Sequence, residues 1–294
     1  MFEIKKLLVP VDFSPRSEAA AKHAAAIAGH FGAEILFLYA VPHGPYEHGL
    51  FDAGFNAGAV WPAAEEIESA VAEQLTAFMD RTAPNAKRFA QVASGGAAEK
   101  ISEAAEQEQV DLIIMPTHGY GPFRRFILGS VTAKVLHDVT FPVLTGTHVE
   151  EIPAGEVQPY RVVACAVDLS PHSEAVLGWA RDFSDAFGAK LHVIHAAPTM
   201  EGLLGEPEHV PANLPEAIEA SRTAQVEELM SRMGVKGGMH VSCDEVSVYA
   251  PSVAAEIDAD LLVIGRSSDT GAIGRLRSHS MSLIRESPCP VVSI

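Results

Sequence analysis

The segment LLVPVDFSPRSEAA, residues 7–20, returns 156 residues later as VACAVDLSPHSEAV, residues 163–176. In both copies a short apolar run ends at Val-Asp, and a Ser-Pro pair follows after one further residue. Short apolar runs are typical of buried strands, and Ser-Pro supplies an N-cap and a first-turn proline for a helix. The repeated segment therefore predicts a strand, a turn and a helix that occur twice in the chain.

The repeat continues beyond this segment. HFGAEILFLYAVP from residue 30 parallels AFGAKLHVIHAAP from residue 186, and VDLIIMP from residue 110 parallels ADLLVIG from residue 259. The offset becomes smaller toward the end of each copy, and we attribute the difference to loop insertions. We therefore expect a first domain over residues 1–148, a linker rich in glutamate and proline at 149–158, and a second domain over 159–294.

Apolar runs alternate with helical segments along the first copy. We expect strands near residues 4–11, 33–41, 88–93, 110–115 and 142–146, and helices near 14–30, 63–81, 97–108 and 130–138. Ser14 and Ser170 are expected to cap the first helix of each copy. This alternation predicts α/β domains, each a Rossmann-like α/β/α sandwich with a mainly parallel five-stranded sheet and right-handed crossovers.

Composition limits the classes of function. The 294 residues include 21 Lys and Arg against 38 Asp and Glu, for a formal charge of −17, which argues against a general binder of nucleic acid or anionic membrane. The three cysteines form no CxxC pair, and we expect Cys165 and Cys289 to lie buried in strands. The N-terminal segment is not typical of a signal peptide, so we expect a soluble cytoplasmic protein without a membrane partner.

A glycine-containing turn follows the fourth expected strand. It reads THGYGPFRRFILGSV over residues 117–131 and leads into a helix. Ligands of open α/β sheets bind beyond the carboxyl ends of the strands, and free N–H groups at a helix start bind phosphate. Arg124 and Arg125 would favour a polyphosphate there, although surface arginines are commonly solvated. Gly119 and Gly129 also fit simple tight turns, and Asp12 also fits a strand end that bonds its own turn.

Three separated motifs resemble the universal stress protein family in its tandem form. They are VPVDFSPxSE at the start, DLIIMPTHG after the fourth strand, and Gly119, nine residues, then Gly129-Ser130-Val131 before VLxxxxxPV. The resemblance implies domains of the HUP type that bind ATP, with Mg²⁺, through the aspartate after strand one and the glycine turn. The positions it implies for nucleotide binding are Val11, Asp12, Val41, Met115, Pro116, His118, Gly119, Gly129, Ser130, Val131 and Thr132.

The chain departs from the family pattern in both copies. Pro116 stands where the family has its first glycine, so this position has no N–H to donate. In the second copy Ser268 and Arg277 replace the second and third glycines, and the spacing is one residue shorter. We therefore expect the first domain to bind ATP and the second to be degenerate, although Asp168 is retained.

No pattern for a catalytic nucleophile or a metal site emerges. No serine–histidine–acid or cysteine–histidine order can be assigned, so we expect no catalytic residues. His43 and His48 share a loop with Glu47 but have no helical or cysteine partner. His192 and His195 are three apart on an expected strand, so they face opposite sides and cannot chelate one ion together.

The resemblance implies an ATP-binding regulatory protein of the stress response that acts on an unknown protein partner. Two other functions stay open: a nucleotide-free scaffold, and a slow ATPase or autokinase. The last strands of family members often pair between domains, so we expect the two halves to dock as a pseudo-dimer, with further homodimerisation possible.

Overall fold

The computed structural model describes residues 2–42, 64–118, 128–146, 160–197, 214–266 and 278–294. The first half contains β1 (Lys6–Pro10), α1 (Pro15–Phe31), β2 (Glu34–Val41), α2 (Ala64–Thr82), β3 (Lys87–Ser94), α3 (Ala97–Glu108), β4 (Leu112–Ile114), α4 (Ser130–Asp138) and β5 (Val143–Thr145). The second half contains β6 (Val162–Ala166), α5 (Ser173–Phe187), β7 (Lys190–Ala196), α7 (Leu214–Arg232), β8 (Gly238–Ser242), α8 (Val246–Glu256), β9 (Leu261–Ile264), α9 (Ser278–Glu286) and β10 (Val291–Ser293).

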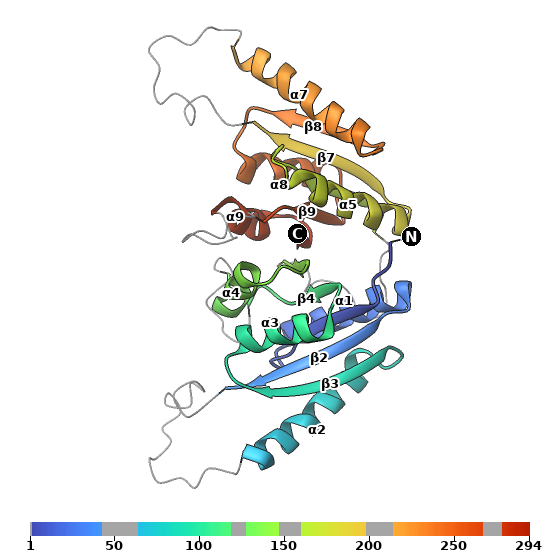
Figure 1. The fold of residues 1–294 in the computed structure, drawn as a ribbon, viewed down its shortest axis with the longest axis vertical. Helices are drawn as coiled ribbons and strands as arrows, with labels where there is room; N and C mark the ends of the chain where they lie inside the picture. Colours follow the sequence, from blue (N-terminus) through green and yellow to red (C-terminus); the bar gives the residue numbers. More distant parts are fainter. Residues whose placement is uncertain (1, 43–63, 119–127, 147–159, 198–213, 267–277) are drawn as a thin grey trace. The chain divides into compact units, whose positions relative to one another are not determined.

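The strands follow the same order in both halves. The described strands run β3-β2-β1-β4-β5 in the first half and β8-β7-β6-β9-β10 in the second. β1 pairs in parallel with β2 and β4, and β6 pairs in parallel with β7 and β9. Helices cover both faces of the strands in each half (Figure 1). The predicted fold, two tandem Rossmann-like α/β sandwiches, is confirmed.

The central strands form the core of each half. Leu7, Leu8 and Val9 of β1 and the whole of β4 have no measurable exposure. β9 is buried along its full length in the same way. Such strands must be apolar on both faces because helices cover both sides of a parallel sheet. This explains why the sequence shows them as continuous apolar runs without alternation.

The caps of the first helix differ between the two copies. Ser14 caps α1 as predicted, since its Oγ accepts a hydrogen bond from the N–H of Ser17 at 3.1 Å. Gly32 ends α1 in the left-handed conformation at φ 69°. The prediction that Ser170 caps α5 is wrong, because α5 begins at Ser173 with His172 at its N-cap and no side-chain cap bond.

The cysteines were predicted to lie buried in strands. Cys165 does so in β6, whereas Cys289 is buried in the turn just before β10. Burial raises the pKa of both thiols, that of Cys289 to about 12, so neither forms a thiolate at neutral pH.

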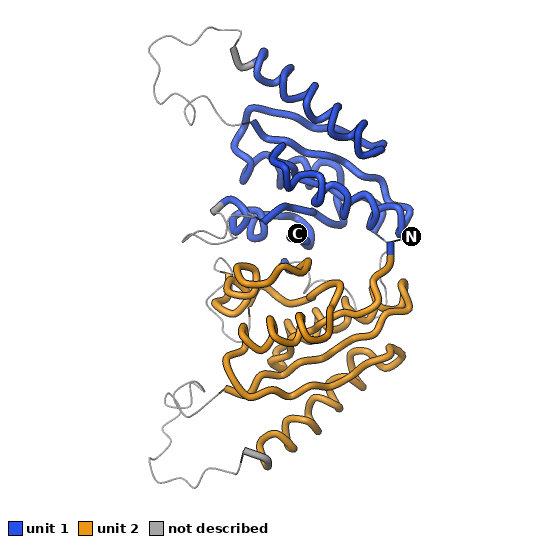
Figure 2. The backbone as a smooth tube through the Cα atoms, viewed as in Figure 1, with its two compact units in different colours: residues 1–2, 144–148, 158–294 blue, residues 3–143, 149–157 orange. Residues whose placement is uncertain are grey.

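The chain divides into two compact units. One comprises residues 3–143 and 149–157, and the other comprises 1–2, 144–148 and 158–294 (Figure 2). Each unit contains its own buried apolar strands. In the described part of the chain, no helix is long and apolar enough to cross a membrane.

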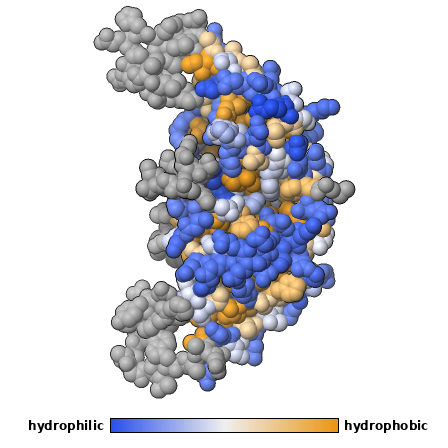
Figure 3. All heavy atoms as spheres, in the orientation of Figure 1, coloured by the Kyte–Doolittle hydropathy of each residue, from blue (hydrophilic) through white to orange (hydrophobic). Residues whose placement is uncertain are grey.

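Hydrophilic residues dominate α3 on the face that Figure 3 shows. Its exposed side chains include Glu99, Glu106 and Glu108, while Ile101, Ala104 and Ala105 are buried. This division of one helix into a polar and an apolar face is typical of a helix that packs on a sheet and meets solvent with its outer side.

Candidate functional site

The turn after β1 holds Asp12 beside a strained residue. Oδ1 of Asp12 accepts a hydrogen bond from the N–H of Ser14 at 2.9 Å. Phe13, between them, has φ 60°, and Leu169 of the second copy has the same φ. This left-handed conformation is unfavourable for large side chains. Residues that adopt it occur more often at binding and active sites than elsewhere. The turn is therefore a constrained element in both halves.

Three aromatic side chains pack together at this turn. The Phe13 ring stacks on Tyr39 of β2 with centroids 4.9 Å apart and meets Phe78 of α2 edge-on at 5.8 Å. Burial and then the negative charge of Asp12 raise the pKa of Tyr39, so this phenol lies within electrostatic reach of the Asp12 carboxylate. The carboxyl ends of β1 and β2 thus present one carboxylate next to an aromatic, partly buried surface.

The residues after β4 hold the start of α4 close to the sheet. The Gly129 N–H donates to the Thr117 carbonyl at 2.8 Å, and Oγ1 of Thr132 donates to the Pro116 carbonyl at 3.0 Å. A Cβ at Gly129 would lie 3.1 Å from the Thr117 oxygen, so glycine permits this approach. Gly129 is also the N-cap of α4 and, having no side chain, makes no side-chain cap bond to the first turn of the helix.

The structure brings three of the predicted segments to one edge of the sheet. Because β2, β1 and β4 are adjacent and parallel, the residues that follow them lie at the same carboxyl edge. Val11, Val41, Met115, His118 and Thr132 are buried there, whereas Ser130 and Val131 at the start of α4 are exposed. Gly119, Arg124, Arg125 and the loop at 43–62 lie outside the described residues.

His118 adds a polar group below the turn. Its side chain is only 7% exposed, and its Nδ1 lies 2.8 Å from Oγ1 of Thr117. The Thr132 bond to Pro116 and the Gly129 bond to Thr117 join the residues just after β4 to the start of α4. The carbonyl of Pro116 is thus already engaged, and its missing N–H offers nothing to a ligand.

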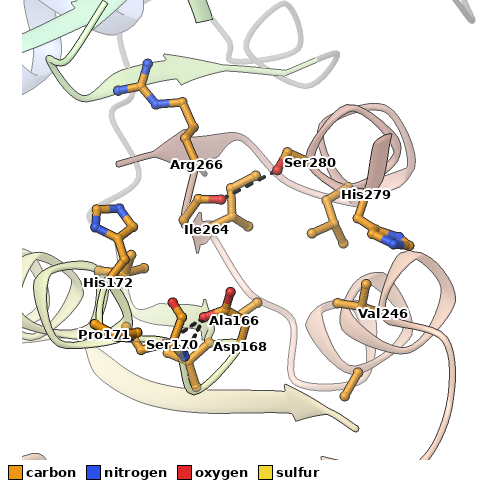
Figure 4. Close-up of a pocket in the computed structure, with 16 residues that line it drawn as sticks. Ala166, Asp168, Ser170, Pro171, His172, Val246, Ile264, Arg266, His279 and Ser280 are labelled. Atoms are coloured by element: carbon orange, nitrogen blue, oxygen red, sulfur yellow. Dashed lines mark hydrogen bonds between the residues drawn. The ribbon is translucent and has the colours of Figure 1, made fainter. Parts of the chain in front are cut away.

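The second half has a pocket at the matching place. It encloses about 260 Å³ and is lined by the ends of β6, β7 and β9 and the starts of α5, α8 and α9 (Figure 4). Oδ1 of Asp168 accepts hydrogen bonds from Ser170 N and Ser173 Oγ, both at 2.9 Å. Burial alone raises the pKa of Asp168, but these hydrogen bonds outweigh it and leave the pKa lowered. Asp168 is therefore a carboxylate at neutral pH.

The two turns after the fourth strands are equivalent but differ in chemistry. Oγ of Ser280 approaches the Gly265 carbonyl at 3.5 Å, as Thr132 approaches Pro116 in the first half. Arg266 takes the place of Thr117, is 5% exposed, and points away from Asp168 in Figure 4. Ser268 and Arg277, the predicted replacements of glycine, lie outside the described residues.

Two histidine contacts in the second half were missed by the sequence analysis. His195, which the 156-residue offset aligns with Tyr39, is buried and its Nδ1 lies 2.8 Å from the Val167 carbonyl. Burial lowers its pKa despite that bond. His192 lies 3.0 Å from His240, measured between Nδ1 and Nε2. The sequence indicated that His192 and His195 lie on a strand. It did not indicate which strand pairs with it, or in which register, and so it could not predict the contact with His240.

No group of three or more His, Cys, Asp or Glu side chains that could hold a metal gathers within the described residues. The described residues of the candidate site therefore do not include a set of three protein ligands for a metal ion.

Comparisons with known proteins agree with this architecture. A family model described as "Universal stress protein family" matches residues 3–145 and 159–294. Universal stress protein MJ0531 of Methanocaldococcus jannaschii is 32% identical over 142 residues, covering 48% of this chain and 80% of that protein. Universal stress protein MJ0577 of the same organism is 29% identical over 150 residues, covering 48% of this chain and 93% of that protein. The crystal structure of a universal stress protein from Archaeoglobus fulgidus is 22% identical with a TM-score of 0.67, and covers 99% of this chain and 98% of its own.

Proposed function

The chain belongs to the universal stress protein family, and from that premise we propose that its first half binds ATP and reports the occupied state to a protein partner. The observation that carries the proposal is the start of α4. Gly129 holds this helix close to the residues that follow β4, and as the N-cap it has no side chain with which to cap the helix. An open helix N-terminus of this kind suits a phosphate group, because its N–H groups and dipole both favour negative charge.

The base of the nucleotide would lie toward the ends of β1 and β2. Val11 and Val41 are buried there, and Asp12 stands within electrostatic reach of Tyr39. A carboxylate can accept hydrogen bonds from an exocyclic amino group, whereas it repels phosphate. This polarity orients the ligand with its amino-bearing ring near Asp12 and its phosphates at Gly129, Ser130 and Val131.

Mg²⁺ fits this site as a companion of the phosphates. Ser130 contributes an exposed hydroxyl at the phosphate end, whereas the carboxylate of Asp12 lies at the end proposed for the base. Mg²⁺ is generally held by few protein ligands together with substrate phosphates and water. When bound, the ion would neutralise phosphate charge, while the protein residues bind and orient the nucleotide.

We propose a regulatory function because, among the described residues of the site, the carboxylate of Asp12 is assigned to the base of the nucleotide and not to the phosphates. His118 is buried, and its Nδ1 faces Thr117. Ser130 and Val131 are exposed at the edge of the site, so a ligand bound there would change the surface that a partner meets. We propose that this change of surface is the signal.

The test is mass spectrometry of small molecules released from the full chain, purified without added nucleotide. We expect ATP at about one per chain from the natural sequence and a strong reduction in Gly129→Ala and Ser130→Ala. Gly29→Ala is the matched control, because a Cβ at Gly29 meets nothing within 4 Å. Absence of nucleotide in every variant, with full partner binding, would favour a nucleotide-free scaffold. Phosphate release that disappears in Asp12→Ala would favour a slow ATPase instead.

A further inference from the structure

A cavity of about 440 Å³ lies where β7 and β8 begin, at the opposite end of these strands from the pocket that contains Asp168. Its walls come from the end of α5, the start of β7 and the turn between α7 and β8. Pockets that bind small molecules commonly have volumes of roughly 300–1,000 Å³, so this cavity is large enough for a ligand.

Two lysines line this cavity where the first half has an ion pair. Glu34 and Lys87 are register partners on β2 and β3, and their side chains form an ion pair. Lys190 and Lys236 occupy the same two positions in the second half and both line the cavity. Each of the four residues stands five positions before a member of the matching register pairs, Tyr39 with Val92 and His195 with Val241. The acidic partner of the first half is thus replaced by a second cation.

Glycines at the start of β8 keep side chains out of the cavity. In the first half the equivalent positions hold Arg88 and Phe89, and the guanidinium of Arg88 bonds carbonyl groups at the end of α2. In the second half they hold Gly237 and Gly238. A Cβ at Gly237 would collide with the carbonyl oxygen of Leu191, so the close approach of the chain to β7 requires glycine there. The space beside the two lysines is therefore not filled from β8.

The helix ends beside the cavity already have hydrogen-bond partners. A helix C-terminus disfavours an anion, and both α5 and α7 end here. Nη1 of Arg181 donates to the Met233 carbonyl at 2.9 Å, and the Ala189 N–H donates to the Ser184 carbonyl at 2.8 Å. Asp182 accepts hydrogen bonds from Nε and Nη2 of Arg181, so this guanidinium is itself neutralised. These contacts reduce the repulsion that free carbonyl groups would exert on an anion.

The remaining charges of the cavity favour an anion. Lys190 and Lys236 are exposed, and among the lining residues Asp185 is the carboxylate that opposes them. Burial, then His240, then Lys190 lower the pKa of His192, so the Lys190 ammonium lies within electrostatic reach of this lining ring, which is neutral at pH 7. In a chain with a formal charge of −17, a cavity with two cations and one carboxylate is a local reversal of charge.

We propose that this cavity binds a phosphate dianion, free or as the monoester of a small molecule, between the ammonium groups of Lys190 and Lys236. Two cations match the two charges of the dianion, whereas a single carboxylate would leave one lysine uncompensated. Asp185 can accept a hydrogen bond from a hydroxyl group of an esterified ligand. The site lies in the second half and does not depend on ATP binding in the first half.

The test is calorimetric titration of the full chain with inorganic phosphate and with glycerol 3-phosphate at pH 7.5 and low salt, where exposed charges are least screened. We expect binding to weaken about tenfold or more in Lys190→Glu and in Lys236→Gln, since each removes a charge-assisted hydrogen bond. Lys87→Gln is the matched control, because Lys87 has the equivalent position in the first half and is paired with Glu34. Tighter binding of glycerol 3-phosphate would support an ester as the ligand, and tighter binding of phosphate would support the free ion.

The ring of His192 gives a readout at the cavity itself. Its carbon-bound proton resonances, assigned by their absence in His192→Gln, should shift when phosphate is added to the natural chain and to Lys87→Gln. They should not shift in Lys190→Glu. Thermal unfolding shows whether each variant is folded, and Lys190→Glu should unfold at no lower temperature than the natural chain, because Lys236 gains the kind of partner that Lys87 has.

Phosphate bound in the first half would be retained in both variants of the cavity lysines, so the two sites are distinguishable. Equal binding by the natural chain, Lys190→Glu and Lys236→Gln would overturn the proposal. A loss of the same size in Lys87→Gln would overturn it too, as would the absence of any shift of the His192 resonances.

Discussion

Gly129 and Gly29 are two glycines of the first half for which alanine should have opposite effects. At Gly129 a Cβ would stand 3.1 Å from the Thr117 oxygen and 3.4 Å from Cα of His118, both backbone atoms. We expect Gly129→Ala to destabilise the first half by about 1–3 kcal/mol because the turn and α4 must move apart. Gly29 lies inside α1 with open space around it, so Gly29→Ala should stabilise by about 0.5–1 kcal/mol. Urea unfolding measures both, and equal effects would contradict the close approach at Gly129.

His23 gives the first half a dependence on pH. It is buried in α1, and burial lowers its pKa from 6.5 to about 4. Between these values the unfolded chain binds a proton that the folded chain does not. The contribution of neutral His23 to the free energy of unfolding is therefore fully present above about pH 6.5 and falls as the pH drops toward 4. At pH 5 the loss should be about 2 kcal/mol, from about 1.4 kcal/mol for each pH unit.

Replacing His23 with glutamine should remove this part of the pH dependence. We expect the free energy of unfolding of His23→Gln to change less between pH 7.5 and pH 5 than that of the natural chain, whatever its value at pH 7.5. His192 and His195, whose pKa values burial also lowers, account for part of the remaining slope. Identical slopes for the two proteins, from urea unfolding at each pH, would show that His23 is not the group responsible.

At the scale of the element, the two first helices differ at their starts. Oγ of Ser14 caps α1, whereas α5 begins after a turn formed by Pro171 and His172. We expect Ser14→Ala to cost about 1 kcal/mol, the usual value of an N-cap, and Ser170→Ala to stay within about 0.5 kcal/mol of the natural chain. Chemical unfolding of the two variants gives the comparison. A larger loss from Ser170→Ala would mean that this serine stabilises its turn in another way.

Most elements of the first half could be predicted because glycine, proline and capping residues mark their ends. α3 at Ala97–Glu108 and α4 at Ser130–Asp138 have the predicted bounds, and β4 is shorter than expected. The start of α5 could not be predicted, because two local structures are compatible with the sequence there. One is a helix that begins at Ser170-Pro171, and the other is a turn held by hydrogen bonds to Asp168. Asp168 bonds both Ser170 N and Ser173 Oγ, and this arrangement favours a turn where Ser-Pro normally begins a helix.

The candidate site was predictable where it depends on strand ends and unpredictable where it depends on register. The alternation of strands and helices predicts a parallel sheet, so the turns that contain Asp12 and Gly129 could be assigned to one edge. The order in which β2, β1 and β4 lie side by side was not predicted and comes from the structure. The His192–His240 contact depends on the pairing of β7 with β8 and on the space left by Gly238. Neither has a local signal in the sequence.

At the scale of the whole molecule, one fold occurs twice with different chemistry. The strand order is the same in both halves, and an aspartate follows the first strand in each. The turn after the fourth strand has Thr117 in one half and the buried Arg266 in the other. We therefore expect the halves to differ in ligand, with ATP in the first half alone.

The most direct test of this account is calorimetric titration of Mg²⁺-ATP into the full chain and into two matched variants, Asp12→Asn and Asp168→Asn. These residues occupy the same position in the two copies, so each variant is the control for the other. The account predicts about one ATP per natural chain, a strong loss of affinity in Asp12→Asn, and unchanged binding in Asp168→Asn. No heat from the natural chain, or a loss confined to Asp168→Asn, would contradict it.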